Sequence, residues 1–550
     1  AAGSWVVGMV SYDAAPAFDP ALASLRNEAV PLVAFGVFDR AEKSDGPSGG
    51  EYMVSRWTAS RSRTSFGHDI DRVRSLIAAG ETYQINYTMR LKAAFAGDPR
   101  GLFAALARAQ HADHLAFLDL GDAAVCSASP ELFLRRDGDM VTGRPMKGTR
   151  PRSTDPARDA ELARELVASE KDRAENTMIV DMTRNDLGRI AQIGTVETPV
   201  LHHVESYPTV HTMTSTVTAR TNASLSELFA ATFPGASITG APKVRTTHAI
   251  ADLERTPRGI FYGCVGALSP AGTQEFNIAI RTVWVDTRRG SAEYGVGGGI
   301  VWDSTAESEW QEARDKTKVL VRASATFELL ETMRWTPSGG VMLRDRHLTR
   351  VRRAADHFGF RFDVQGVETA LDRVRGNVDQ RLRLVCSADA SFTLTEVSLD
   401  DEFVSTPDQA ADLPVWQLPL DSAPIDLGDE FLFHKTTRRE RYEAARASHP
   451  NAPDVLLWNE RRELTETTIG NLVVRLDGRL VTPPVASSLL AGTFREELFA
   501  IGVISEQVVS IDDLLRADEL YMINSVRGWV RIVAGAMPRL PGPMPRSREV

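Results

Sequence analysis

Cysteine, long apolar runs and positive charge are all scarce in this chain. It has three cysteines in 550 residues, far apart and without metal-ligand spacing, which suits a reducing cytoplasm. No run of about 18 apolar residues occurs, so we expect no membrane span. The first residues lack the basic and apolar segments of a signal peptide. The net charge of −10 argues against a nucleic-acid-binding surface.

The chain has an ordinary globular composition, but it is longer than a single hydrophobic core usually accommodates. Hydrophobic residues make up 43% and charged residues 25% of its 550 residues, so two or more domains are expected. Alternating patterns at residues 124–135 and 276–285 predict strands. Patterns at residues 157–169 and 224–232 predict helices. The mixture predicts an α+β fold class.

The main domain boundary is expected near residues 323–326. A helical pattern runs from Ser308 toward Ala323, and strand-like residues followed by a turn begin at Phe327. The tail is rich in proline, and we expect it to be disordered. The predicted parts are an N-terminal domain, a C-terminal domain and this tail: residues 1–323, 324–536 and 537–550.

A series of short motifs runs in order through the N-terminal part. Any one of them is a weak signal, whereas the ordered set is specific. Together they resemble the chorismate-utilising enzymes, which implies a β-sandwich with helices and a pocket for chorismate. The motifs occupy residues 83–88, 129–133, 142–152, 171–176, 184–189, 240–243, 297–300 and 309–316.

The residue type at position 147, here lysine, differs between family members that catalyse different reactions. Enzymes similar to this chain usually carry alanine here when they make anthranilate, and lysine in a Pro-x-Lys-Gly-Thr context when they make aminodeoxychorismate. An amine beside an electron-poor diene can act as nucleophile or base, and alanine can do neither. The resemblance implies that Lys147 attacks C2 of chorismate while Glu131, as general acid, protonates the departing C4 hydroxyl. Ammonia then enters at C4.

Chorismate is a dicarboxylate, so its pocket needs positive charge. Mg²⁺ prefers one or two protein carboxylates, and the resemblance assigns Glu175 and Glu312 to it. Spacing alone favours another reading, in which Glu312 and Lys316 form an exposed i,i+4 ion pair. The resemblance implies substrate contacts from Gly148, Thr149, Thr239, Tyr262, Arg281, Gly297, Gly298, Gly299 and Lys316.

The source of ammonia is expected to lie outside these two domains. None of the three cysteines stands in the Gly-x-Cys-x-Gly setting of a glutaminase nucleophile. The N-terminal part must therefore use free ammonia or a separate glutamine amidotransferase subunit, and the family usually uses the subunit.

The C-terminal part carries its own ordered motifs, at residues 330–334, 346–350, 433–438, 464–472 and 490–495. They resemble the fold-type-IV pyridoxal-phosphate enzymes, which include branched-chain and D-amino acid aminotransferases and aminodeoxychorismate lyase. The cofactor aldehyde needs a lysine to bond to, and Lys435 fits. Glu466 would keep the pyridine nitrogen protonated. Arg350 and the helix start at Gly492 and Thr493 would bind the phosphate.

The two resemblances together predict a bifunctional cytoplasmic enzyme of 4-aminobenzoate synthesis, a step toward folate. Chorismate would be aminated to 4-amino-4-deoxychorismate, and pyruvate would then be eliminated to leave 4-aminobenzoate. A shared chain raises the local concentration of the intermediate at the second site. A homodimer through the C-terminal domain is expected from the resemblance alone.

Three alternatives stay open on the sequence. The N-terminal half could make anthranilate, salicylate or isochorismate, because synthases of the last two also carry a lysine at position 147. The C-terminal half could be an amino acid aminotransferase. One half could instead be a non-catalytic docking module for an amidotransferase subunit.

Overall fold

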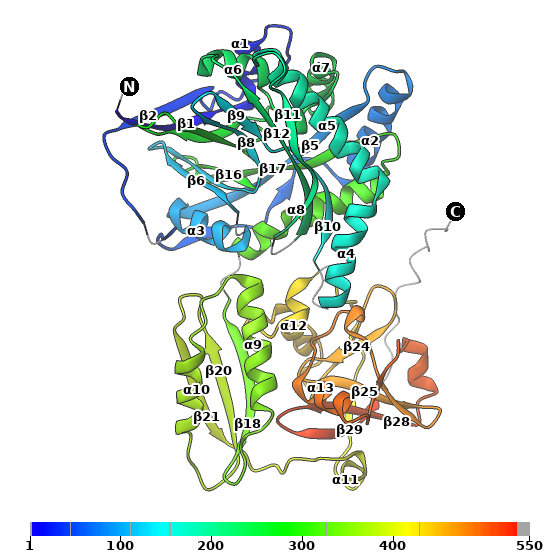
Figure 1. The fold of residues 1–550 in the computed structure, drawn as a ribbon. Coiled ribbons are helices and arrows are strands. Elements are labelled where there is room, and N and C mark those ends of the chain that lie inside the picture. The colour runs from blue at the N-terminus through cyan, green and yellow to red at the C-terminus, as the bar shows by residue number, and fades with distance from the viewer. Residues whose placement is uncertain are drawn as a thin grey trace. The chain divides into compact units, whose positions relative to one another are not determined.

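The chain forms two compact units, Ala1–Ala325 and Thr326–Val550, shown in Figure 1. The computed structural model describes residues 3–44, 46–110, 112–152, 156–207, 210–324, 327–427 and 429–535. The proline-rich tail at residues 537–550 lies outside the described residues. Within the described ranges, no helix combines the length and the apolar character that a membrane span requires.

The N-terminal unit is built on two sheets. The first has the strand order β10-β12-β9-β8-β15-β14-β1-β2, and β11 pairs with β12. Its strands are β1 (Trp5–Val10), β2 (Val33–Phe38), β8 (Leu132–Asp137), β9 (Met140–Gly143), β10 (Met146–Pro151), β11 (Glu197–Ser206), β12 (Val210–Arg220), β14 (Cys264–Leu268) and β15 (Gln274–Ile278).

The second sheet of this unit has the order β13-β5-β17-β16-β7-β6, with β3 and β4 also paired to β5. Its strands are β3 (Tyr52–Val54), β4 (Thr58–Ala59), β5 (Gln84–Gly97), β6 (His114–Asp119), β7 (Ala123–Ser129), β13 (Gly240–Ala241), β16 (Thr282–Asp286) and β17 (Ser291–Ile300).

The two sheets pack face to face around a shared apolar cluster. Met9 and Val265 of the first sheet lie in one buried cluster with Leu118, Val125 and Trp284 of the second. Alternating apolar positions on each strand supply this inner face, as expected for a sandwich. The predicted β-sandwich is therefore confirmed.

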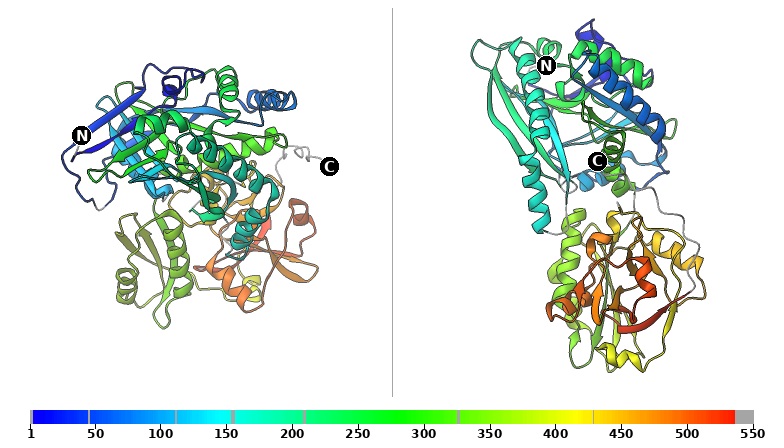
Figure 2. Two further views of the ribbon diagram at one scale, coloured as in Figure 1. Left: turned by 45° about the horizontal axis from the view of Figure 1, so that its top comes forward. Right: turned by 90° about the vertical axis from the view of Figure 1, so that its right-hand side faces the viewer.

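Helices cover the outer faces of both sheets (Figure 1), and Figure 2 turns the same ribbon. One cluster joins β5 and β17 to α2, α3, α7 and α8, and another joins β8 and β12 to α5 and α6. The helices are α1 (Ala15–Phe18), α2 (Arg63–Ala78), α3 (Pro99–Gln110), α4 (Pro156–Ala168), α5 (Glu170–Gly188), α6 (Leu225–Thr232), α7 (Lys243–Glu254) and α8 (Ala306–Ser324).

Two strands predicted as continuous are interrupted in the structure. The pattern at residues 124–135 splits into β7 and β8 at Pro130 and Glu131. The pattern at residues 276–285 splits into β15 and β16 at residues 279–281, where the φ of Arg281 is 51°. A break frees a residue from the sheet ladder and lets its side chain turn aside. Both breaks carry residues that line the cavity described below.

The C-terminal unit also contains two sheets. A small one has the order β19-β18-β20-β21, and a larger one the order β22-β29-β28-β25-β24-β23, to which β26 and β27 are joined. The strands are β18 (Leu329–Thr336), β19 (Gly340–Val341), β20 (Gln380–Cys386), β21 (Phe392–Ser398), β22 (Trp416–Leu418), β23 (Leu456–Trp458), β24 (Leu464–Thr467), β25 (Asn471–Leu476), β26 (Arg479–Thr482), β27 (Ser505–Glu506), β28 (Glu519–Asn524) and β29 (Gly528–Ala534).

Helices complete the C-terminal unit and place its candidate residues. Helix α9 packs along β18, and α13 joins β25 and β28 in one apolar cluster. The helices are α9 (Arg344–Phe358), α10 (Val364–Arg373), α11 (Pro407–Ala411), α12 (Glu440–Ser448) and α13 (Thr493–Ala500).

Candidate active sites

The N-terminal unit encloses a cavity of about 280 Å³ that brings most of the predicted site residues together. They come from β10, α5, the two strand breaks, the segment before β14, the glycine run of β17 and helix α8. The predicted residues on its wall are Glu131, Lys147, Gly148, Thr149, Glu175, Tyr262, Arg281, Gly297, Gly298, Gly299, Glu312 and Lys316.

Thr239 is the exception among the predicted substrate contacts. It is fully buried but does not stand among the described residues that line the cavity. Its hydroxyl turns back and donates to the carbonyl of Gly235 at 3.1 Å, and its own carbonyl accepts from the amide of Asn86. Thr239 therefore supports Asn86, which does line the cavity.

Lys147 reaches the cavity from an irregular edge strand. The register between β10 and β12 shifts between Met146 and Thr149, and such a bulge redirects a side chain. Its Nζ lies against the glycine run, since a Cβ on Gly299 would come within 2.6 Å of it. Burial lowers the pKa of Lys147, although Glu175 opposes this shift. The amine is therefore biased toward its neutral, nucleophilic form.

Glu131 is a buried acid facing the same cavity. It is 5% exposed, and the hydroxyl of Ser237 donates to its Oε1 at 2.6 Å. Burial raises the pKa of Glu131 to about 7, while Ser237 and Lys147 act in the other direction. The carboxyl can therefore hold a proton near neutral pH, which a general acid requires.

Three carboxylates crowd the wall opposite the glycine run. Burial, and then the nearby Glu312, raise the pKa of Glu309 to about 7. Burial also raises the pKa of Glu175, and Glu312 adds to the shift. A Cβ on Gly298 would come within 3.2 Å of Glu312 Oε1 and 3.4 Å of Glu309 Oε2. The carboxylate oxygens, which repel one another, therefore lie directly against Gly298, and any side chain at this position would crowd them.

Lys316 makes a second contact besides its ion pair with Glu312. Its Nζ donates to Glu312 Oε1 at 2.6 Å and to the carbonyl of Gly297 at 2.8 Å. It holds the pKa of Glu312 below its usual value. Arg281 is tied to this corner as well, because its guanidinium donates to the carbonyl of Lys316. Two cations therefore stand on the wall where a dianion would need them.

The C-terminal unit encloses a second cavity, of about 300 Å³, that all five predicted cofactor residues line: Arg350, Lys435, Glu466, Gly492 and Thr493. The backbone around Lys435 is tied to β18, since the carbonyl of Lys435 accepts from the amide of Leu330 at 2.9 Å. Burial, and then Arg350, lower the pKa of Lys435 to about 8. Each unit thus places one of the two lysines predicted to be catalytic, Lys147 and Lys435, on the wall of a cavity.

Glu466 and the start of α13 line the same cavity as Lys435. The hydroxyl of Tyr442 donates to Glu466 Oε1 at 2.7 Å, and burial raises the pKa of Glu466 to about 8. Helix α13 begins at Thr493 after Gly492, where a Cβ would meet Asn471 Oδ1 at 2.0 Å. Only glycine permits this close approach, which brings the free amides of the helix start to the cavity.

Glu331 is a functional residue that the sequence reasoning left unassigned. It is 1% exposed and accepts two hydrogen bonds from the Arg350 guanidinium, at 2.8 and 2.7 Å, and one from His347 at 2.7 Å. Although burial opposes it, Arg350 and His347 hold the pKa of Glu331 at about 2. His347 in turn contacts the Thr493 hydroxyl at 3.2 Å. Glu331 therefore positions two groups beside the cavity, and the available signal was an acid directly after two leucines in a strand that is mostly buried.

Replacing Glu331 by glutamine is expected to destabilise the C-terminal unit by about 3 kcal/mol, because Arg350 is then left as an uncompensated buried charge. Urea unfolding of the full chain measures the loss. The matched control is Asp372→Asn, whose partner Arg344 lies on the same helix as Arg350. The Asp372 side chain is 61% exposed, and its loss should cost less than about 1 kcal/mol. Equal losses in the two variants would contradict this account of Glu331.

The two units match two known protein families. A sandwich whose cavity brings Lys147 together with buried acids, joined to a unit whose own cavity is lined by Lys435 and Glu466, defines a two-site enzyme. The chain belongs to the chorismate binding enzyme family, whose sequence model matches residues 1–322. Residues 328–534 match the amino-transferase class IV family. The two resemblances predicted from the motifs are thus confirmed, and the second family implies pyridoxal phosphate.

The relatives match the N-terminal half. Aminodeoxychorismate synthase component 1 of Salmonella typhimurium is 44% identical over 266 residues, 48% of this chain and 58% of that protein. Aminodeoxychorismate synthase of Streptomyces griseus is 46% identical over 257 residues, 46% of this chain and 35% of that protein. Anthranilate synthase component I of Streptococcus pneumoniae superposes with a TM-score of 0.50 at 26% identity, over 57% of this chain and 80% of that one. The aligned segments thus span about half the length of these curated relatives, or less.

Proposed function

We propose that the chain makes 4-aminobenzoate from chorismate and ammonia in two steps, one in each unit. Residues 1–323 would form the synthase domain and residues 324–536 the lyase domain. The observation that carries the proposal is Lys147, held in one cavity with the protonatable Glu131. The similarity to aminodeoxychorismate synthases and the class IV match support it.

The first step uses two groups whose shifted pKa values suit their tasks. The neutral Lys147 Nζ bonds to C2, the ring double bonds shift, and the C4–O bond breaks. Glu131 gives its proton to the departing hydroxyl, which leaves as water. Ammonia then bonds to C4, the double bonds shift back, and Lys147 leaves C2 with its electron pair. The new C4 ammonium returns a proton to Glu131, so the site is restored.

The carboxylates fit a magnesium ion held jointly with substrate. Glu175 and Glu312 would bind it. The described ranges contain no group of three or more His, Cys, Asp or Glu side chains that could hold a metal ion, so substrate or water oxygens would supply the other ligands. Mg²⁺ ordinarily uses one or two protein carboxylates and completes its shell with other oxygens. It would supply the charge that offsets a substrate carboxylate and the repulsion between Glu175 and Glu312. Arg281, Lys316 and the amides of Gly297–Gly299 would orient the substrate.

The second cavity fits pyridoxal phosphate. Lys435 would bond to its aldehyde, Glu466 would face the pyridine nitrogen, and Thr493 with the start of α13 and Arg350 would bind the phosphate. When bound, the cofactor would supply a sink for the electrons released at substrate C4. Lys435 Nζ would then remove the C4 proton. Return of that proton to the enolpyruvyl methylene would release pyruvate and leave an aromatic ring.

Arginines support a dianionic substrate in this second cavity. Arg381 and Arg383 point to one face of β20, and both line the cavity with Arg439 and Arg527. A branched-chain amino acid would offer these arginines one carboxylate, whereas aminodeoxychorismate offers two. The arrangement therefore favours the lyase over an aminotransferase for apolar amino acids.

The deciding experiment is product analysis of the purified chain with chorismate, Mg²⁺ and ammonium, with and without added pyridoxal phosphate. Mass spectrometry should find 4-aminobenzoate and pyruvate with the cofactor. Anthranilate, salicylate or isochorismate as the product would overturn the first step. A separate glutamine amidotransferase subunit is proposed as the natural source of ammonia, since relatives carry the designation component 1.

The amination rate should fall as pH rises above about 7, because Glu131, with its raised pKa of about 7, is the proton donor only below that value. It should also fall at low pH, where Lys147 is protonated. The measurement is kcat/KM for chorismate between about pH 6 and about pH 9, with free ammonia held constant. In Glu131→Gln the high-pH limb should vanish along with most of the rate. A flat wild-type profile would contradict the acid role of Glu131.

A further inference from the structure

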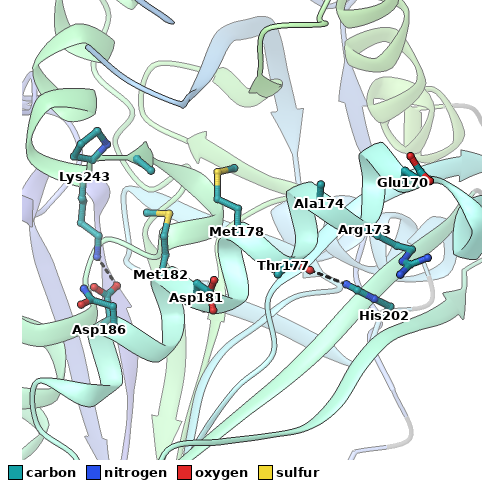
Figure 3. Close-up of a pocket in the computed structure, with 13 residues that line it drawn as sticks. Glu170, Arg173, Ala174, Thr177, Met178, Asp181, Met182, Asp186, His202 and Lys243 are labelled. Atoms are coloured by element: carbon teal, nitrogen blue, oxygen red, sulfur yellow. Dashed lines mark hydrogen bonds and ion pairs between the residues drawn. The ribbon is translucent and has the colours of Figure 1, made fainter. Parts of the chain in front are cut away.

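A buried ion pair joins two sequence motifs of the N-terminal unit that have no part in the proposed reaction steps. Lys243, from the motif at residues 240–243, donates through Nζ to Asp186 Oδ2 at 2.7 Å, and Asp186 belongs to the motif at residues 184–189. The two side chains are only 17% and 11% exposed. Figure 3 shows the pair at one end of a groove of about 1030 Å³ that α5 lines. Withdrawing two charges from water is costly, so stability alone is a poor explanation for this pair.

Lys243 also holds together the two ends of one connection between helices. The α6–α7 connection, residues 233–242, leaves α6 after Thr232 and enters α7 at Lys243. Lys243 Nζ makes its second hydrogen bond to the carbonyl of Thr232, at 3.3 Å, and Asp186 of α5 fixes the position of that Nζ. Because both ends are tied to α5, the connection loses conformations that a free segment of this length would reach.

The centre of the α6–α7 connection reaches the proposed general acid. Ser237 lies midway along it, and the Ser237 hydroxyl donates to Glu131 Oε1 at 2.6 Å. A hydroxyl that donates to one carboxyl oxygen fixes the rotation of the group and favours the acid proton on the other oxygen. Asp186, Thr232, Ser237 and Glu131 all line one small cavity of about 30 Å³, so the ion pair lies close to the acid.

We propose that Asp186 and Lys243 are positioning residues for Glu131. They hold the ends of the α6–α7 connection together, so that Ser237 stays where it orients the acid. The inference rests on the proposed function, in which Glu131 protonates the departing C4 hydroxyl. Neither member of the pair stands among the described residues that line the chorismate cavity, so any effect of the pair on the reaction passes through its neighbours.

The test compares Lys243→Met with Ser237→Ala in the full chain, singly and combined. Lys243→Met leaves the Asp186 charge unpaired, so if this variant folds poorly, Asp186→Leu is combined with it to remove both charges. The matched control is Arg245→Met, two residues along α7, whose ion pair with Glu81 is exposed. The measurement is kcat/KM for chorismate between about pH 6 and about pH 9, with free ammonia held constant.

Lys243→Met is expected to lower kcat/KM for chorismate at pH 7 at least about tenfold, since a small displacement of a catalytic group can cost up to about 100-fold. Two bonds to the connection remain, from Asn86 to the Ser237 carbonyl and from Arg258 to the Ile238 carbonyl, so the loss should be partial.

The high-pH limb of the profile gives a readout that general loosening would not move. The limb should shift upward by at least about 0.5 pH unit in Lys243→Met, and likewise in Ser237→Ala, because the Ser237 hydroxyl no longer favours the ionised acid. The other titratable groups of the chorismate cavity, Lys147 and Lys316 among them, are unchanged in every variant. Arg245→Met should match wild type in both rate and limb.

The combined variant decides whether Lys243 acts through Ser237. If it does, Lys243→Met changes the rate less than about twofold, and moves the limb no further, once Ser237 is already alanine. Additive losses, or an unmoved limb in Lys243→Met, would overturn the positioning role while the proposed function stands. A wild-type chain that forms no aminated product would defeat the proposed function, and the positioning role with it.

Discussion

Lys147→Ala is expected to lower formation of 4-amino-4-deoxychorismate by at least about 10³-fold, because it removes the amine proposed to bond to C2. Lys147 Nζ lies against Gly299 in the chorismate cavity, and its pKa is lowered by burial. Alanine keeps the backbone of β10 and removes only the nucleophile. The measurement is single-turnover product analysis with chorismate, Mg²⁺ and saturating ammonium.

Lys92→Ala serves as the matched control for this prediction. Lys92 lies on β5 of the same unit, and its side chain is 68% exposed beside Glu293. Its loss should leave the rate unchanged within about twofold and the stability within about 0.5 kcal/mol. Retention of normal amination by Lys147→Ala, with Glu131 intact, would show that the amine does not bond to the ring.

Lys435→Ala is expected to stop the second step and leave the first intact. Aminodeoxychorismate should then accumulate, and formation of 4-aminobenzoate and pyruvate should fall at least about 10³-fold. The reason is that Lys435 is proposed both to hold the cofactor and to remove the C4 proton. A time course by liquid chromatography separates the intermediate from the product.

The accumulation gives this second prediction an internal control. Because the intermediate is proposed to form in the N-terminal unit, its appearance would show that the variant chain is folded and active there. Loss of the characteristic absorbance of the lysine-bound cofactor would be a second readout that does not depend on turnover. Normal 4-aminobenzoate formation by Lys435→Ala would refute the lyase assignment.

The sequence allowed the secondary structure and the two-part organisation to be anticipated, with errors at informative places. Helix α6, predicted at 224–232, begins at Leu225 after the Ser224 cap, because capping signals are local. The strands predicted at 124–135 and 276–285 are each broken. A period-2 pattern continues across a short interruption, so the breaks that carry Glu131 and Arg281 cannot be seen in it.

Supporting residues were harder to find than the principal ones. Ser237 on Glu131 and Glu331 on Arg350 act through contacts 106 and 19 residues away in the chain. Thr239, by contrast, matched a family contact but turns its hydroxyl to Gly235. A motif match predicts which residue type has a role at a position, but it does not predict the direction in which the side chain points.

The sequence by itself determined which residue types were present for chemistry: two lysines in ordered motifs, the acids that accompany them, and two families side by side. These follow from local order, which a linear chain displays directly. Only the tertiary structure decided which of these groups meet in one cavity and how burial shifts their pKa values. Such properties depend on which distant segments exclude water together, and packing alone establishes that.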